Sequence, residues 1–324
     1  METASVWRKL SFFISSSHSQ NYLSHCYKQL GIPDYERRSF ENCYPFIYYL
    51  EHGKSYYELS RISPLSIKPV LLFYGMIQLL KACLLTVDPN YPESTSVLAH
   101  GVTTRKRKKQ SYEFLQDEVK IQRNGLFTHI AEQMFHMKHL EGEKFTMEVL
   151  LKRVGELKDL FTYSKKAPEL YAVKRVSDTM ISVPKPILDR YNMTEDRFIE
   201  YFQSSCSHLD IHPEVSQNTK DYIYFRSSLE NWNGLLSSPL TYDFYTNTHY
   251  LPINRELMNV FPEMLVHYLL LYNLSMISRY ETEWWSELLH SYSTEDYPFI
   301  HQFLSVSSDK IPYYIYLYLI TKTK

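Results

Sequence analysis

The sequence contains little glycine and little cysteine for its length. Eight glycines and four cysteines occur among 324 residues, whereas hydrophobic residues make up 44% of the chain. This composition excludes a fibrous or largely disordered chain and is typical of a packed globular protein. The cysteines, Cys26, Cys43, Cys83 and Cys206, are far apart and form no C-x-x-C pair. We therefore expect reduced thiols that are buried or incidental.

An excess of charge of either sign is also missing. The 35 basic and 36 acidic residues leave a net charge of −1, so no overall field attracts the protein to nucleic acid or anionic lipid. The one dense basic run covers residues 105–109. Such a short run is typical of a solvated loop, and a phosphate-contacting patch is the alternative.

Long uninterrupted apolar runs are absent as well. Segments 70–87 and 311–320 fall short of the ~20 apolar residues that a membrane-spanning helix needs. Residues 1–15 have no small-residue cleavage site of the kind that follows a signal peptide. We expect core helices in both apolar segments, and a cytoplasmic protein without membrane contact.

Several enzyme motifs do not occur. The chain has no G-x-x-x-x-G-K-[ST], G-x-G-x-x-G, H-E-x-x-H or G-x-S-x-G sequence. These absences argue against nucleotide hydrolases, dinucleotide enzymes, zincins and α/β-hydrolases. They favour a binding protein over an enzyme, and we expect neither a cofactor nor a bound metal.

Helical periodicity dominates what is present. The clearest helix covers Val70 to Val87, which is apolar on nearly all sides and should form the centre of an N-terminal core. A helical pair hinged at Gly53 is expected over 40–51 and 54–61. Other helices are expected over 7–15, 18–30, 126–140, 146–161, 192–202, 258–289, 294–304 and 311–320.

Period-two alternation predicts a few strands among these helices. The aromatic and β-branched segments lie at 118–122, 171–183, 221–226 and 242–251. The fold class is therefore mainly α, a helical bundle with a small inserted β region. We expect an N-terminal helical region at 1–165, a mixed α/β region at 166–255 and a C-terminal helical region at 256–324, either as separate domains or as one continuous domain.

Tyrosine is in excess, with 29 residues. Tyrosine combines apolar area with a polar tip, so it suits both a core edged with satisfied hydroxyls and an adaptable binding surface. A binding surface made of such residues would fit a protein partner better than a polyanion.

Arg123 and His129 form the first candidate site. Their spacing is similar to the R-x(4–6)-H pattern of HEPN ribonucleases, which are helical proteins that cleave RNA without metal and commonly act as dimers. A histidine can move the 2′-hydroxyl proton while an arginine stabilises the charge that develops on the phosphate. The same helical stripe carries Glu132, His136 and His139. Glu132 and His136, four residues apart, could share a divalent ion, or the stripe could simply be a solvated face.

The second candidate is Arg279-Tyr280, next to Trp284 and Trp285. An arginine late in an apolar helix could hold a phosphate or carboxylate while stacking on an indole. It could equally pair with Glu281 or Glu283, or bond the carbonyls of its own helix.

A family resemblance adds to these patterns. Residues 274–280, followed by Trp285, resemble the L-S-S-x-x-R-Y-x-P-x-x-W signature of YaaC-like bacterial proteins. The helix after Pro69 resembles the family's P-x-L-x-x-Y-x-x-x-x-L-x-K-A pattern, His100-Gly101 its H-G pair, and Gly125-x-Phe127 its G-x-F element.

This resemblance implies a helical intracellular protein without a settled reaction. Genes of the family often lie beside the gene for IMP dehydrogenase, which makes that purine-pathway enzyme a candidate partner. We predict a non-catalytic binding or regulatory protein that acts on a protein partner or a small anion, with Arg279, Tyr280 and His100 as ligand-binding residues. The alternative is a HEPN-like ribonuclease that uses Arg123 and His129. A homodimer is compatible with either function.

Overall fold

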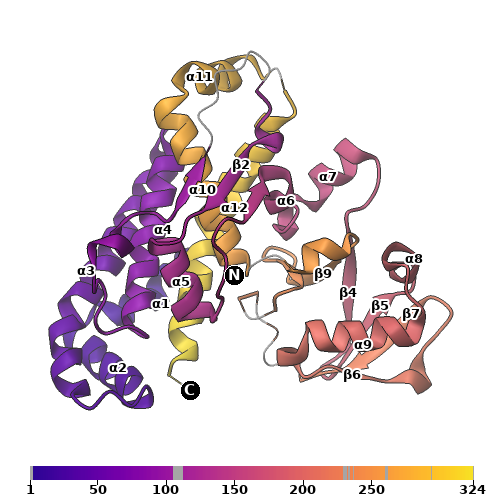
Figure 1. Ribbon diagram of the computed structural model, residues 1–324, viewed down its shortest axis with the longest axis horizontal. Helices are drawn as coiled ribbons and strands as arrows, with labels where there is room; N and C mark the ends of the chain where they lie inside the picture. Colours follow the sequence, from indigo (N-terminus) through magenta and orange to yellow (C-terminus); the bar gives the residue numbers. More distant parts are fainter. Residues whose placement is uncertain are drawn as a thin grey trace. The chain divides into compact units, whose positions relative to one another are not determined.

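The computed structural model describes residues 3–104, 112–228, 232, 234–235, 237–259, 262–292 and 294–323. The basic run at 105–109 lies outside these described residues. The chain forms two compact units (Figure 1). The first consists of Met1–Glu148 and His267–Lys324, and the second of Val149–Val266. The three regions expected from the sequence, 1–165, 166–255 and 256–324, stay a prediction.

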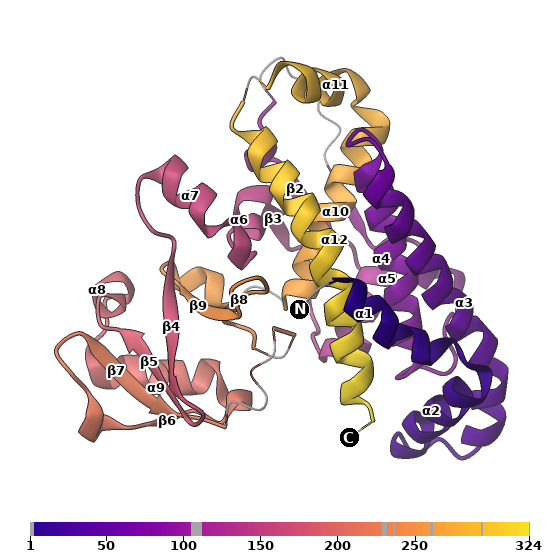
Figure 2. The same cartoon turned by 180° about the vertical axis from the view of Figure 1, so that it is seen from behind.

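The first unit is built mainly from helices. They are α1 (Thr3–Leu10), α2 (Ser16–Gln29), α3 (Tyr35–Ile62), α4 (Lys68–Leu85), α5 (Leu126–Phe135), α10 (Glu263–Tyr280), which enters this unit at His267, α11 (Thr282–Ser291) and α12 (Asp296–Thr321). The helix α3 packs between α2 and α4, and α12 packs against both α4 and α1 (Figure 2). A small antiparallel sheet of β1 (Val102–Thr104), β2 (Glu118–Ile121) and β3 (Lys144–Thr146) completes the unit.

The central helix α4 confirms the strongest expectation from the sequence. Its apolar side chains point in nearly all directions, and those of Leu72, Phe73, Met76, Leu79 and Leu80 are completely buried. Among the described helices, α4 is the one with the length and hydropathy of a membrane span, yet 67% of it is buried inside the protein. Its apolar surface is therefore already used by the core.

The helix α3 corrects one expectation, because it runs without a break through Gly53. Gly53 is a point of close approach rather than a hinge. A Cβ atom there would lie 2.5 Å from Cδ2 of Leu79 in α4, and one at Gly75 of α4 would lie 2.8 Å from the ring of Tyr57 in α3. The two glycines let the two helices pack closely along their lengths.

The C-terminal helix α12 is also continuous, where the periodicity predicts separate helices over 294–304 and 311–320. Pro312 lies inside it. A proline removes one intrahelical hydrogen bond. The neighbouring Ile311, Tyr314 and Ile315 are fully buried, so packing holds the helix together across that position.

Other expected helices are shorter than the periodicity indicates. The helix predicted over 126–140 ends at Phe135, because His136 adopts a left-handed φ of 55° and its N–H caps the helix on earlier carbonyls. The helix predicted over 258–289 begins only after Pro262 and is interrupted at Glu281, between α10 and α11.

The helix predicted over 146–161 is divided. Thr146 ends β3, and two short helices follow, α6 (Met147–Leu151) and α7 (Lys158–Lys165). The side chain of Arg153, between them, is buried and donates to the carbonyl of Pro239 at 2.6 Å. This contact with a distant segment holds the chain in a non-helical path.

The second unit contains the β region predicted from period-two alternation. Its sheet has the order β6-β7-β5-β4-β9-β8, with all neighbours antiparallel. The strands are β4 (Leu170–Ser177), β5 (Met180–Pro184), β6 (His212–Pro213), β7 (Tyr222–Arg226), β8 (Thr241–Asp243) and β9 (Thr248–Pro252). Alternate residues of β5 and β7 pack with α8 (Ile187–Tyr191) and α9 (Glu195–Ser205) into one hydrophobic core (Figure 1). The fold is therefore mainly helical with small sheets, as expected.

Candidate anion-binding site

Two glycines fix the position of His100 in the first unit. Gly101 has a φ of 76° and Gly125 a φ of 141°, which are left-handed values that favour glycine. A Cβ atom on Gly125 would lie 2.2 Å from the Cα atom of Gly101. The two backbone segments therefore touch directly, and only glycine fits at the contact.

Hydrogen bonds secure the same contact. The carbonyl of His100 accepts from the N–H of Phe127 at 3.2 Å and from the hydroxyl of Tyr268 at 2.9 Å. The N–H of Leu126 donates to the carbonyl of Ala99 at 2.7 Å. The segment that carries His100 is thus tied to the start of α5 and to α10.

Aromatic rings from two helices surround the imidazole of His100. Ring centroids of Phe73 and Tyr74 in α4 lie 5.0 and 6.1 Å away, and that of Tyr272 in α10 lies 5.7 Å away. All these contacts are edge-to-face, which suits the charge distribution of aromatic rings. They fix the orientation of a half-buried imidazole.

Arg279, near the end of α10, faces the same tyrosines. Its guanidinium donates from Nε to the carbonyl of Ser275 at 3.0 Å and lies 5.8 Å from the ring centre of Tyr74 and 5.1 Å from that of Tyr280. One Nη reaches the Tyr74 hydroxyl at 3.4 Å. The tyrosine rings and the hydrogen bond to the Ser275 carbonyl orient the guanidinium group. In the part of the chain that the structure describes, no carboxylate contacts it.

Lys81 adds a second cation from α4. It lies seven residues after Tyr74, so both side chains leave the same face of the helix. Its ammonium group lies 5.6 Å from the ring centre of Tyr49, and burial lowers its pKa. Within the described residues, no carboxylate forms an ion pair with Lys81.

The charges of this site act on His100. Burial, followed by the positive charges of Arg279 and Lys81, lowers the pKa of the imidazole below its usual value, so the ring is neutral near pH 7. Its Nδ1 atom is buried and has no hydrogen-bond partner among the described residues. We call the group formed by Tyr74, Lys81, His100, Tyr272 and Arg279 the His100 site. It can accept an anion or a polar group but has no nucleophile arranged against a base.

The sequence-predicted ligand residues thus come together only in part. Arg279 and His100 lie in one site, and Tyr280 borders it with 66% of its surface exposed. The expected indole stacking does not occur, because Trp285 donates to the carbonyl of Ser66 at 2.9 Å and Trp284 packs on Tyr112. Arg279 contacts tyrosines instead.

Tyr272 was not predicted as a site residue. It lies seven residues before Arg279 on α10, two helical turns away and on the same face. That spacing was visible in the sequence, but a buried tyrosine in an apolar helix gives no sign of what it faces.

The ribonuclease candidates lie at the start of α5. Arg123 is exposed in the turn before the helix, whereas His129 lies within it and is bonded to Asp88 through Nε2 at 2.9 Å. The ring of His129 also stacks on Tyr91. No hydrogen bond or ion pair joins Arg123 to His129 in the described structure, so the two do not form a preassembled pair.

The residues of the predicted metal stripe do not all lie on one helix. Because α5 ends at Phe135, His136 and His139 lie beyond it, and both have positive φ values. Glu132 pairs with Lys138 at 3.7 Å. Over the described residues, no three His, Cys, Asp or Glu side chains cluster in a way that could hold a metal ion.

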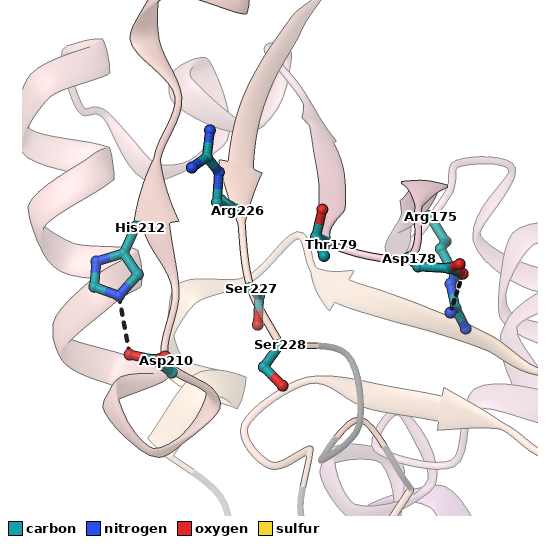
Figure 3. A pocket seen from close by; sticks show the side chains of 8 residues that line it. All are labelled: Arg175, Asp178, Thr179, Asp210, His212, Arg226, Ser227 and Ser228. Carbon is teal, nitrogen blue, oxygen red and sulfur yellow. Dashed lines mark hydrogen bonds and ion pairs between the residues drawn. The ribbon is translucent and has the colours of Figure 1, made fainter.

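The second unit has a shallow cavity of about 560 Å³ (Figure 3). Its basic side chains already have carboxylate partners. Arg175 pairs with Asp178 at 2.8 Å, His212 with Asp210 at 2.9 Å, and Arg226 with Glu214 at 2.7 Å. The two arginines of this cavity each have a carboxylate partner within the protein, in contrast to the cations of the His100 site.

Comparison with known proteins identifies the family. The model of the YaaC-like proteins matches residues 11–319, which is nearly the whole chain. The chain belongs to the YaaC-like family. The comparisons with curated proteins and with solved structures found no match. In this YaaC-like protein, the elements that carry the resemblance, namely the α4 pattern, His100-Gly101, Gly125-x-Phe127 and Arg279-Tyr280, meet around the His100 site.

Proposed function

We propose that this YaaC-like protein is a non-catalytic, cytoplasmic binding protein whose His100 site receives an anionic group. One observation carries the proposal. The positive charges of Arg279 and Lys81 both act on a half-buried histidine, and no carboxylate neutralises either cation among the described residues. Elsewhere in the chain, the cations that line the cavity of Figure 3 are paired.

The physical reason is the cost of leaving charges partly buried. A cation removed from water loses hydration, and the lowered pKa of Lys81 reflects that loss. An incoming anion would restore favourable interactions with both cations and would offer an oxygen to His100. The guanidinium, held by Ser275 and two tyrosine rings, is oriented to bind a carboxylate or phosphate.

A matched set of variants tests this site. Phosphate and acetate are titrated into the protein, and binding is followed by calorimetry. Arg279→Gln removes the charge and the guanidinium but keeps a polar side chain, and the loss of a charged hydrogen bond should weaken anion binding about tenfold or more. Arg175→Gln, in the cavity of Figure 3, is the control and should bind like the parent. Equal affinities for the Arg279 variant and the parent would overturn the proposal.

We propose that the bound anionic group is part of a protein partner or of a nucleotide that the partner binds. The first partner to test is IMP dehydrogenase, as the family resemblance implies. The purified proteins are mixed at micromolar concentration and separated by size-exclusion chromatography with and without nucleotide. A joint peak that Arg279→Gln abolishes supports this partner, and unshifted peaks in both conditions exclude it.

A ribonuclease is the second candidate, supported by one observation. Asp88 holds His129 at 2.9 Å and could orient the imidazole as a general base, in the way that a carboxylate orients a catalytic histidine. The test is cleavage of single-stranded RNA. If the protein is a ribonuclease, it should cleave the RNA, His129→Ala should abolish the cleavage, and EDTA should leave it unchanged. RNA that stays intact across a range of substrates would count against this function.

A further inference from the structure

The helix α3 exposes a stripe of large apolar side chains. Its members are Phe40, Tyr44, Tyr48, Leu59 and Ile62, which are 65%, 53%, 55%, 52% and 84% exposed. Successive members are four, four, eleven and three residues apart, which is close to one, one, three and one turns of a helix. All five therefore lie on one face of the helix. The opposite face carries buried residues such as Phe46, Leu50 and Tyr57, which pack in the core. We call this exposed set the α3 stripe.

The α3 stripe is larger than isolated surface residues explain. An aromatic side chain offers 150–250 Å², and with the exposed fractions above the five residues present roughly 500 Å² of apolar surface. This is near the upper limit for patches on monomeric proteins. Glu51, Ser55 and Glu58 are exposed on the same face between Tyr48 and Leu59, so these polar residues and the apolar ones together would supply the ~800 Å² per partner of a standard protein interface.

The order of residues in the stripe is nearly symmetric about its middle. Phe40 and Ile62 lie eleven residues to either side of Glu51, and Tyr44 and Leu59 lie seven and eight residues from it. Four of the five members thus lie toward the ends of the stripe, and the fifth, Tyr48, lies three residues before Glu51. A surface with this arrangement is complementary to itself when a second helix lies against it in the opposite direction, as a two-fold interface requires.

We propose that two copies of this chain associate through their α3 stripes, antiparallel about a two-fold axis near Glu51. In that arrangement, Phe40 of one copy meets Ile62 of the second copy, and Tyr44 meets Leu59. The rings of Phe40 and Tyr44 are then covered by aliphatic side chains, and Tyr48 lies opposite Lys54 of the second copy. The four aromatic–aliphatic contacts remove the exposed apolar ends from water.

Charges near the axis are compatible with this pairing. Glu51 of each copy lies close to the axis, and Lys54 follows three residues later, about 4.5 Å along the helix. Within its own chain, Lys54 has one ion pair, a 3.7 Å contact with Glu58. Its ammonium group is flexible enough to reach Glu51 of the second copy, so two reciprocal ion pairs offset the repulsion between the two carboxylates.

The first test measures the oligomeric state of the full chain by sedimentation velocity at micromolar concentrations. The parent is expected to sediment as a dimer. Tyr44→Glu places a negative charge against Leu59 and beside Glu58 of the second copy, and should give a monomer with an unchanged circular dichroism spectrum. Tyr163→Glu alters a tyrosine of α7 that is 81% exposed, more than the 53% of Tyr44, and should leave the dimer intact. A monomeric parent, or a dimer that persists in the Tyr44 variant, overturns the proposal.

The second test introduces single cysteines to determine which residues of the two α3 helices lie opposite each other. All four native cysteines are buried, so an introduced thiol is the one exposed reactive cysteine. Glu51→Cys places two thiols beside the axis, and mild oxidation should link the copies. Glu58→Cys puts the thiols roughly 20 Å apart along the helices and should not link them. Equal cross-linking of both variants, or none at position 51, refutes the antiparallel register.

Discussion

The close contact between Gly53 and Leu79 predicts that Gly53→Ala lowers the free energy of unfolding of the parent protein but raises that of the Leu79→Ala variant. A Cβ atom at position 53 would lie 2.5 Å from Cδ2 and 2.7 Å from Cγ of Leu79, and 3.3 Å from the carbonyl oxygen of Gly75. The first two distances are shorter than any real packing contact, whereas the third requires only a small adjustment. Leu79 is therefore the side chain that excludes alanine from position 53.

The expected free energies follow from these distances. Leu79 is fully buried, so Leu79→Ala should lower the free energy of unfolding by ~2–5 kcal/mol through lost transfer energy and a cavity. Gly53→Ala in the parent should cost ~1–3 kcal/mol from overpacking, offset by up to ~1 kcal/mol of helix propensity. In the Leu79→Ala protein, the same methyl group fills part of the cavity. There, Gly53→Ala should stabilise the protein, which gives a coupling energy of at least ~1 kcal/mol.

The assay is chemical denaturation of the four proteins of this double-mutant cycle, followed by circular dichroism and tryptophan fluorescence. Three of the four tryptophans, Trp7, Trp284 and Trp285, lie in the first unit, so fluorescence reports mainly on the unit that contains the contact. If Gly53→Ala costs the same free energy in both backgrounds, to within ~0.5 kcal/mol, the packing explanation of Gly53 is refuted.

Three further predictions concern other parts of the chain. Gly125→Ala should abolish anion binding and lower the melting temperature, because its Cβ atom would lie 2.2 Å from Cα of Gly101 and displace His100; calorimetry and thermal denaturation measure both effects. The native protein should react with no equivalent of Ellman's reagent, since burial raises the pKa of Cys26 to about 11 and that of Cys206 to about 12, and all four thiols should react in guanidinium. Because the pKa of His100 is lowered from 6.5, the unfolded chain binds a proton before the folded chain does. Stability should therefore fall as the pH drops below about 6.5, until the folded-state pKa is reached, and His100→Gln should remove this part of the pH dependence.

Much of the secondary structure was predictable from local patterns. The helix α4 is apolar on nearly all sides, and only a helix surrounded by protein can satisfy that pattern. The strand β7 has the alternating burial of a strand with one face on a core, and β4, β5 and β9 were predicted from their aromatic and β-branched residues. The family resemblance was also carried by the sequence, because its elements are short runs with fixed spacing.

Element boundaries were less predictable where packing overrides a local signal. Gly53 and Pro312 are usual signs of a helix break, yet α3 and α12 continue through both. At Gly53 the neighbouring helix needs the space of the missing side chain, and at Pro312 the buried neighbours outweigh one lost hydrogen bond. In both cases the deciding interaction comes from residues distant in sequence.

The His100 site shows most clearly what each level of structure determined. The sequence by itself singled out His100, Arg279 and Tyr280 as separate residues on separate segments. Only the tertiary structure brought His100 within the influence of the charges of Arg279 and Lys81, through the contact of Gly101 with Gly125 and the packing of α10 on the loop. It also decided that these cations have no carboxylate beside them, whereas those of the cavity in the second unit do. Local spacing fixes which residues share a helix face, but the balance of charge in a site depends on distances between segments, and only the folded chain defines those.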